Sequence, residues 1–287
     1  MTAPSKKRPE GTVAAGEVLD RIIEAKAARL AAARIAVPLE RMIAQSNTVA
    51  ASRVRRSLAE SLLTPDRVNI IAEIKHRSPS KGVIREDFDP VAIAEAYEEG
   101  GAAAMSVLAE EDFFGGSLDH IKRIRPLTSV PLLRKDFVFD EYQMHESVAA
   151  GADAVLLIVA VLDDDLLARL LGLANRLGLD ALVEAHTADE MRRAHQAGAR
   201  IIGVNNRDLA RLKLNREGRE TDLETSFRLA ELAPPGAVLV SESGINSGDD
   251  IRKLKSAGFN GFLIGEHFMR ATDPGFALRR MIASAND

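Results

Sequence analysis

Two charged side chains stand where a buried strand should be apolar. In the stretch IIAEIKHRSPSKG, residues 70–82, Glu73 and Lys75 interrupt and end an apolar run. Because residues two positions apart in a strand share one face, this carboxylate and this amine are expected to lie side by side. A lysine in a partly dry pocket can form a Schiff base with a carbonyl or donate a proton to it, and a nearby glutamate can remove or relay protons. The stretch therefore predicts acid–base chemistry at the end of a strand.

The same feature recurs along the chain. Short apolar runs such as VPLLRK, DALVEAH, RIIGVNN and AVLVSES each end in charged, amide or hydroxyl side chains. Arg207 and Lys75 have the chemistry to clamp an anionic group such as a carboxylate or a phosphate. The polar residues at these strand ends are Glu110, Lys135, Asp136, Glu184, Asn205, Arg207, Glu242 and Ser243.

The elements that must position these residues follow one alternating pattern. From Val68 onward, eight apolar, β-branched runs alternate with amphipathic stretches of helical periodicity. The runs are nearly continuous in apolar residues, as in strands of a parallel sheet that is covered on both faces. A doubly wound open sheet also produces such alternation, but eight units within about 200 residues favour a closed (β/α)8 barrel, a TIM barrel. Glycines recur where the helices end, at Gly101, Gly151, Gly198 and Gly258.

This fold predicts where the chemistry lies. Active sites of such barrels form at the carboxyl ends of the strands, and loops after the last two strands often bind phosphate through backbone N–H groups. Here those loops contain SESGINSGDD and LIGEHFM, with Gly244 and Gly265 in the turns. We therefore expect a cup of converging polar side chains with a phosphate subsite on one side.

Three segments are predicted. Residues 1–12 are polar and contain Pro and Gly, which is typical of a disordered tail. Residues 13–66 form a helical extension that packs on the barrel, with helical apolar spacing interrupted near Pro38. Residues 67–287 form the catalytic barrel.

Composition excludes several classes of function. The formal net charge of −4, the 4% aromatic content and the lack of Trp argue against nucleic-acid binding. The segment AVLLIVAVLDDDLLARLL is broken by three aspartates, so no membrane span is expected. Without cysteine there is no thiolate chemistry, which suits a reducing cytoplasm. The histidines form no metal-binding pattern, so neither a metal nor a cofactor is predicted, and His186, although close to the cup, is expected to be structural.

With these residues placed, the chain resembles indole-3-glycerol phosphate synthase of tryptophan biosynthesis from about residue 16 to 285. The motifs that carry the resemblance are AEIKHRSPSKG, SVLAEEDFFGGS, LLRKDFVFDEYQ, GADAVLLIVAVL, LVEAHT, IGVNNRDL, SESGI and LIGEHFMR. The family closes the indole ring of 1-(2-carboxyphenylamino)-1-deoxyribulose 5-phosphate with loss of carbon dioxide and water. The resemblance therefore implies a carboxy-lyase that acts on a small phosphorylated substrate, located in the cytoplasm, as a monomer or weak homodimer.

The resemblance also implies roles for individual residues. Lys135 matches the general acid that protonates the substrate carbonyl, and Glu184 matches the base or proton relay of the dehydration. Lys75 would contact a substrate anion and share the acid's role, while Glu73 would hold the lysines. The remaining matches are residues that bind the carboxylated ring (Ser78, Asn205, Arg207), line the cup (Phe114, Phe137, Glu242, Ser243) or hold the phosphate (Gly244, Ile245, Gly265, Glu266). The polar segment 210–227 is expected to be a flexible loop.

Three other readings stay open on the residues alone. The barrel can instead be a phosphoribosylanthranilate isomerase, or an aldolase that forms a Schiff base on Lys75 or Lys135. It can also be a catalytically inactive barrel that serves as a binding module. The presence of Lys135 and Glu184 together argues against the isomerase and the inactive barrel.

Overall fold

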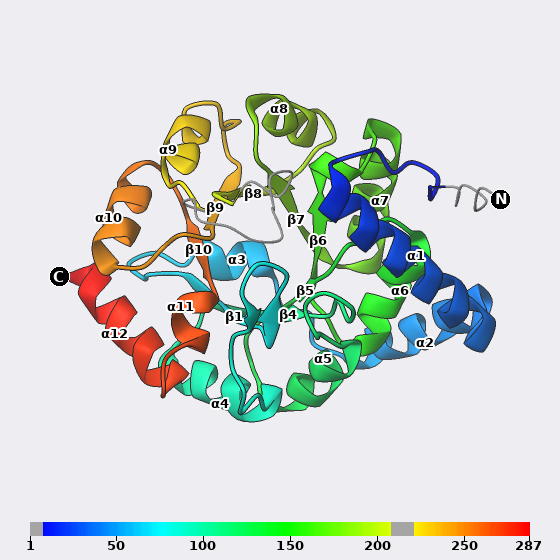
Figure 1. Cartoon of the computed structure of the whole chain (residues 1–287), viewed down its shortest axis with the longest axis horizontal. Coiled ribbons are helices and arrows are strands. Elements are labelled where there is room, and N and C mark those ends of the chain that lie inside the picture. Colours follow the sequence, from blue (N-terminus) through cyan, green and yellow to red (C-terminus); the bar gives the residue numbers. More distant parts are fainter. Residues whose placement is uncertain (1–7, 208–220) are drawn as a thin grey trace.

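The computed structural model describes residues 8–207 and 221–287 and shows a closed barrel of parallel strands surrounded by helices (Figure 1). The strands follow one another around the barrel in the order β1-β4-β5-β6-β7-β8-β9-β10 and back to β1. The prediction of a (β/α)8 barrel is confirmed. The strands are β1 (Ile70–Ile74), β4 (Ala104–Leu108), β5 (Leu132–Lys135), β6 (Ala154–Ile158), β7 (Asp180–Ala185), β8 (Ile201–Asn205), β9 (Val238–Glu242) and β10 (Gly261–Ile264).

The strands are short, and nearly every strand residue is buried, as expected where helices cover one face and packed side chains fill the barrel. The register between neighbouring strands brings their polar ends to one level. Asn205 on β8 stands opposite Glu242 on β9, and Glu184 on β7 stands opposite Ile158 on β6. The carboxyl ends of the strands therefore form one rim.

The helices of the barrel begin and end at the signals in the sequence. Asp89, Asp140 and Asp163 each accept a backbone N–H at a helix N-terminus, and the four glycines predicted to end helices all have positive φ. The helices are α4 (Pro90–Gly100), α5 (Leu118–Ile124), α6 (Glu141–Ala150), α7 (Asp164–Leu177), α8 (Ala188–Gln196), α9 (Glu224–Ala230), α10 (Gly248–Ser256), α11 (Glu266–Met269) and α12 (Pro274–Asn286). Short elements at loops are the hairpin β2 (Arg77–Ser78) and β3 (Gly82–Val83), and the 3-10 turns η1 (Arg125–Leu127) and η2 (Val159–Val161).

Three helices precede the barrel: α1 (Glu17–Ala36), α2 (Leu39–Ser52) and α3 (Leu58–Leu62). Pro38 stands directly before α2, at the interruption that the sequence indicates. Helix α1 runs past α6 and the loops above it, and α2 lies beside α6 (Figure 1). The side chains of Leu58 and Leu62 on α3 are fully buried. The division into a helical extension over residues 13–66 and a barrel over residues 67–287 stays a prediction.

Two segments expected to be disordered or flexible are described in part. In the tail, residues 1–7 lie outside the described residues, whereas residues 8–12 contact the chain: Thr12 forms a bridge with Leu162, and Arg8 pairs with Asp20 at 3.0 Å. In the segment 210–227, residues 210–220 lie outside the described residues. Its remainder is ordered, because Thr221 forms a bridge with Arg207 and α9 begins within it, so the expectation of a loop is wrong there.

No helix in the described ranges is both long and apolar enough to cross a lipid bilayer.

Candidate active site

A cavity of about 590 Å³ opens at the carboxyl ends of the strands. Apolar side chains of β4, β6 and β10 line one part of the cavity, and charged and amide side chains line another part. The volume is typical of a site for a small organic ligand. The lining includes Glu73, Lys75, Phe114, Lys135, Phe137, Glu184, Asn205, Arg207, Glu242, Ser243, Gly244, Ile245, Gly265 and Glu266.

Lys135 is the centre of the charged cluster. It ends β5, and its Nζ lies 3.0 Å from Oε2 of Glu184 and 3.3 Å from Oε2 of Glu242. Burial alone would lower the pKa of the Lys135 amine, but the carboxylate of Glu184, the carboxyl group of Glu242 and the carboxylate of Glu73 outweigh burial and raise it. The amine is therefore a charged proton donor in a site that excludes most water.

Glu184 is held as an ionised base. Its side chain is fully buried, which would raise the pKa of the carboxyl, yet the charges of Lys135 and His186 lower it below its usual range. The Nε2 of His186 lies 3.4 Å from Oε1 of Glu184, and its Nδ1 lies 3.3 Å from Oε2 of Glu190. Burial lowers the pKa of the His186 imidazole, but Glu190, Glu184 and Glu242 outweigh it and raise the pKa. His186 thus contacts one oxygen of the Glu184 carboxylate, and Lys135 contacts the other.

Glu242 differs from Glu184 although both contact the same amine. Burial and the neighbouring carboxylates of Glu184 and Glu73 outweigh the attraction of Lys135, and together they raise the pKa of Glu242 to about 8. Gly203 on β8 makes room for this side chain, because a Cβ at that position would lie 2.0 Å from Oε1 of Glu242. Glu242 is therefore a neutral carboxylic acid near pH 7.

Glu73 and Lys75 form the ion pair that their spacing predicts. The Nζ of Lys75 donates to Oε1 of Glu73, and both side chains are nearly buried. Burial raises the pKa of Glu73, but Lys75, Lys135 and Arg207 overcome it and lower the pKa. Gly265 follows β10 beside this pair, and a Cβ there would lie 2.3 Å from Oε1 of Glu73. The backbone after β10 thus approaches the charged cluster closely.

Beside the Glu73–Lys75 pair, the loops after β9 and β10 line the cavity. Ser243 and Gly244 have φ of 69° and 79°, so the chain turns sharply directly after Glu242. Arg207 lies 3.6 Å from Glu266, and Glu266 also pairs with Arg270 at 2.9 Å. Two guanidinium groups therefore stand near the backbone turns, where they favour an anionic ligand.

Two aromatic rings form the apolar wall. The ring centroids of Phe114, in the loop after β4, and Phe137, in the loop after β5, lie 6.3 Å apart, and both rings line the cavity. A planar aromatic ligand therefore has apolar surface on one side and the charged cluster of Lys135 on the other.

Comparison with known proteins gives the family. The family model described as indole-3-glycerol phosphate synthase matches residues 19–281. The chain belongs to the indole-3-glycerol phosphate synthase family. It is 44% identical over 269 residues to the indole-3-glycerol phosphate synthase of Carboxydothermus hydrogenoformans, covering 92% of this chain and 99% of that one. It is 43% identical to that of Albidiferax ferrireducens, covering 94% and 99%. The 3-hexulose-6-phosphate synthase of Salmonella typhimurium, 14% identical with a TM-score of 0.57, covers 76% of this chain and 98% of its own, and shares the fold.

The cavity brings together every residue that the resemblance to the indole-3-glycerol phosphate synthase family implies, with one exception. Ser78 does not line the cavity. It is buried in the hairpin after β1, where its hydroxyl accepts the backbone N–H of Lys81 at 3.3 Å. The hydroxyl of Ser78 therefore supports the hairpin.

Other lining residues were not predicted as site residues. Ser80 and Lys81 line the cavity from the hairpin after β1, and Asn246, His267 and Arg270 line it from the loops after β9 and β10. The sequence contains a signal for the hairpin residues, because SPSKG follows Lys75 directly. Arg270 ends the motif LIGEHFMR, but it lies beyond α11, where the position of the strand end does not indicate the direction of its side chain.

Proposed function

We propose that this member of the indole-3-glycerol phosphate synthase family converts 1-(2-carboxyphenylamino)-1-deoxyribulose 5-phosphate to indole-3-glycerol phosphate, carbon dioxide and water in the cavity above β1 to β10. The observation that carries the proposal is the position of Lys135. Its charged amine contacts Glu184 and Glu242 between an apolar aromatic wall and a cationic rim. The substrate has the matching parts, namely a ring, a carbonyl, a carboxylate and a phosphate.

Ring closure requires a proton donor at the carbonyl oxygen. A new bond forms between the ring carbon that bears the carboxylate and the carbonyl carbon, and Lys135 gives its proton to the oxygen, which becomes a hydroxyl. Loss of carbon dioxide then restores the aromatic ring. A general acid in such a position contributes about 10²–10⁴-fold to the rate. Lys75, hydrogen-bonded to Glu73, stands on the neighbouring side of the cavity to bind the carboxylate and to share this role.

Dehydration requires a base, and Glu184 supplies it. The hydroxyl leaves as water with a proton from Lys75, which regains one from solvent because loss of carbon dioxide from a carboxylate consumes one proton per turnover. The Glu184 carboxylate takes the proton released from the ring system. The lowered pKa of Glu184 keeps this carboxylate ionised near neutral pH. Its contact with Lys135 allows the proton to return to the amine, so that the site is reset after each turnover.

The rest of the cavity positions the substrate. Phe114 and Phe137 hold the ring, while Asn205 and Arg207 face the carboxylate from β8. The backbone of Gly244, Ile245, Gly265 and Glu266, together with Ser243, holds the phosphate. Glu242, neutral near pH 7, accepts or donates a hydrogen bond without adding a charge that would repel either anion.

The direct test is indole fluorescence from purified protein supplied with this substrate. We expect turnover in the wild type, and a loss of about 10²–10⁴-fold in kcat with a modest change in binding for Lys135→Ala. Unchanged turnover in this variant would refute the role of Lys135. Borohydride treatment in the presence of substrate separates the proposal from an aldolase, because only a Schiff base leaves a reduced adduct on lysine.

We also expect a cytoplasmic location and a monomer or weak homodimer. Size-exclusion chromatography with light scattering across a range of concentrations tests the second expectation, and a stable higher oligomer would contradict it.

A further inference from the structure

A buried lysine on the N-terminal extension connects two loops of the barrel. Lys26 lies on α1, yet only 4% of it is exposed. Its Nζ lies 2.6 Å from Oε2 of Glu111 and 2.9 Å from Oδ1 of Asp136. A lysine is rarely buried to this extent unless it is paired. Lys26 therefore ties α1 to the loop after β4 and to the end of β5 at the same time.

Asp136 connects Lys26 to Phe137, one of the two aromatic residues of the apolar wall. It follows Lys135 directly, so its side chain points to the opposite face of the chain, toward α1. Its Oδ1 accepts the backbone N–H of Phe137 at 2.9 Å, and its Oδ2 accepts from Arg134 at 2.8 Å. Burial raises the pKa of Asp136, but Arg134 and Lys26 overcome it and hold the pKa below its usual value. The carboxylate is therefore charged and fixes the backbone of Phe137.

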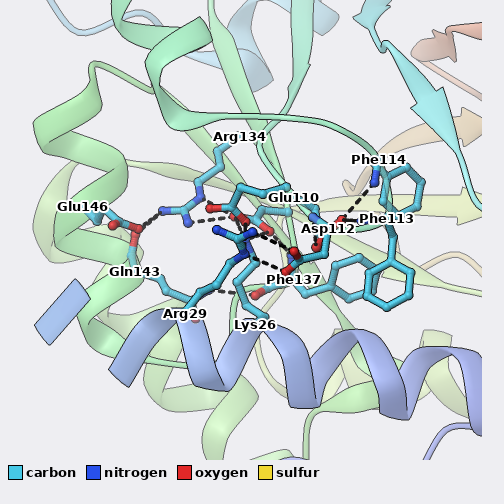
Figure 2. Close-up of polar contacts among 12 residues, drawn as sticks. Lys26, Arg29, Glu110, Asp112, Phe113, Phe114, Arg134, Phe137, Gln143 and Glu146 are labelled. Carbon is cyan, nitrogen blue, oxygen red and sulfur yellow. Dashed lines mark hydrogen bonds and ion pairs between the residues drawn. The ribbon is translucent and has the colours of Figure 1, made fainter. Parts of the chain in front are cut away.

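Glu111 connects Lys26 to the loop after β4, which contains Phe114. The adjacent Glu110 is fully buried, and its carboxylate accepts the backbone N–H groups of residues 112–114 at 2.8 to 3.1 Å. These bonds fold the loop around Glu110 and place Phe114 over the cavity. A second α1 residue, Arg29, pairs with Asp112 of the same loop through two hydrogen bonds of 2.6 Å (Figure 2).

We propose that Lys26 is a positioning residue for the substrate's ring: it sets the separation between Phe114 and Phe137 by binding the loop of one and the strand end of the other. This inference rests on the proposed function, because the ring that lies against Phe114 and Phe137 is that of the substrate. Lys26 itself does not line the cavity. Its amine acts only through Glu111 and Asp136.

The docking of α1 does not depend on Lys26 alone. Leu19, Ile22, Ile23 and Leu30 on the same helix are buried against the apolar core. A Lys26→Met substitution keeps most of the side chain's volume and removes only the charge. The helix is therefore expected to stay in place while the two loops lose their common cation.

Steady-state kinetics of Lys26→Met test the proposal. We expect KM to rise about tenfold or more, because misplaced binding groups are costly, and kcat to fall by less than about threefold, because Lys135 keeps Glu184 and Glu242. Arg34→Met is the matched control. Arg34 also joins α1 to the barrel, through Asp140 at 2.6 Å, but that pair is more exposed, and Asp140 is the N-cap of α6, three residues beyond Phe137.

Two results would overturn the proposal. One is a KM for Lys26→Met within about twofold of the wild type, well short of the factor of ten that 1.4 kcal/mol represents. The other is an equal rise in KM for Arg34→Met, which would show that docking of α1 is what matters. Should Lys26→Met fail to fold, Glu111→Gln removes the charge of the more exposed partner, and an unchanged KM in that variant would also overturn the proposal.

A chemical rescue separates the amine from general packing. The chain contains no cysteine, so Lys26→Cys has a single thiol. Alkylation of that thiol with 2-bromoethylamine in denaturant, followed by refolding, restores a lysine-like amine. We expect KM to return toward the wild-type value, and failure to recover in a refolded, alkylated protein would count against the proposal. Turnover by the wild type reports on the proposed function, whereas the ratio of variant to wild type reports on Lys26, so the two failures give different results.

Discussion

Strand β7 has a buried carboxylate near each end, and the two are treated in opposite ways. At the amino end, Asp180 accepts from the Ser57 hydroxyl at 2.9 Å and from the Ala59 backbone N–H at 3.1 Å, and it pairs with Arg55. At the carboxyl end, Oε2 of Glu184 contacts Lys135, whereas Oε1 lies 3.4 Å from Nε2 of His186 and accepts no hydrogen bond among residues 8–207 and 221–287.

The difference separates stability from function within a single strand. A buried carboxylate whose oxygens are both paired contributes to folding, because breaking its bonds leaves buried groups unsatisfied. An oxygen of a buried carboxylate that accepts no hydrogen bond is available to a substrate or a proton. This matches the general division of (β/α)8 barrels into a stabilising face and a catalytic face.

The largest effect is expected from Glu184→Gln. The amide cannot take a proton, so kcat should fall by about 10²–10⁴-fold in the indole fluorescence assay. The midpoint of urea unfolding at pH 7 should fall, because the lowered pKa of Glu184 means that its charge stabilises the folded state and because Lys135 loses its partner. A kcat within about tenfold of the wild type would remove the base assignment.

At the other end of β7, a substitution is expected to lower stability and leave activity unchanged. Asp180→Ala leaves Ser57 and the N-terminus of α3 without their acceptor, and the free energy of unfolding should fall by about 2 kcal/mol in urea titrations, with kcat/KM unchanged. The exposed Asp189 is the control, and its alanine variant should stay within about 0.5 kcal/mol of the wild type. Loss of activity in folded Asp180→Ala would contradict the division of β7 into a stabilising end and a catalytic end.

The effect of Glu242 on the stability of the folded state should depend on pH. Its carboxyl has a pKa near 4.5 when unfolded and about 8 when folded, so the folded state holds an extra proton in between. Stability from this group is complete below about 4.5 and is lost as the pH rises toward 8. Glu242→Gln should therefore raise the thermal midpoint at pH 8 more than at pH 5, by scanning calorimetry. An equal change at both values would contradict the raised pKa.

The smallest effect is expected from His186→Asn. A protonated His186 lowers the pKa of Glu184, so its removal lets that pKa rise, and the acid limb of the kcat profile should move to higher pH. The change should disappear above the raised pKa of His186, where the wild-type imidazole is also neutral. His195→Asn on the outer face of α8 is the control. An acid limb at the same pH in wild type and His186→Asn would show that His186 does not influence the base.

Much of the candidate site could be predicted because its signals are local. Residues that end consecutive parallel strands must meet at one rim, so Lys135, Glu184 and Glu242 converge once the barrel closes. The contact between Glu73 and Lys75 needed only their spacing. Ser78 did not follow this logic, since it lies in a hairpin beyond the strand, where no periodicity sets the direction of its side chain.

The remaining features depend on contacts between distant segments. Lys26 and Asp136 are 110 positions apart, and nothing near either residue indicates the other. The contact between Glu184 and His186, in contrast, follows from their spacing of two positions, as it does for Glu73 and Lys75.

The amino-acid sequence alone determined the barrel, the order of its strands and the rim at which the polar residues gather, because helix and strand periodicity and strand-end positions are properties of neighbouring residues. Only the tertiary structure decided which oxygen of Glu184 accepts no hydrogen bond, which carboxyl near Lys135 holds a proton, and that Lys26 ties the two aromatic loops together. These properties depend on burial and on charges that folding brings within a few ångströms, and neither can be read from chain spacing.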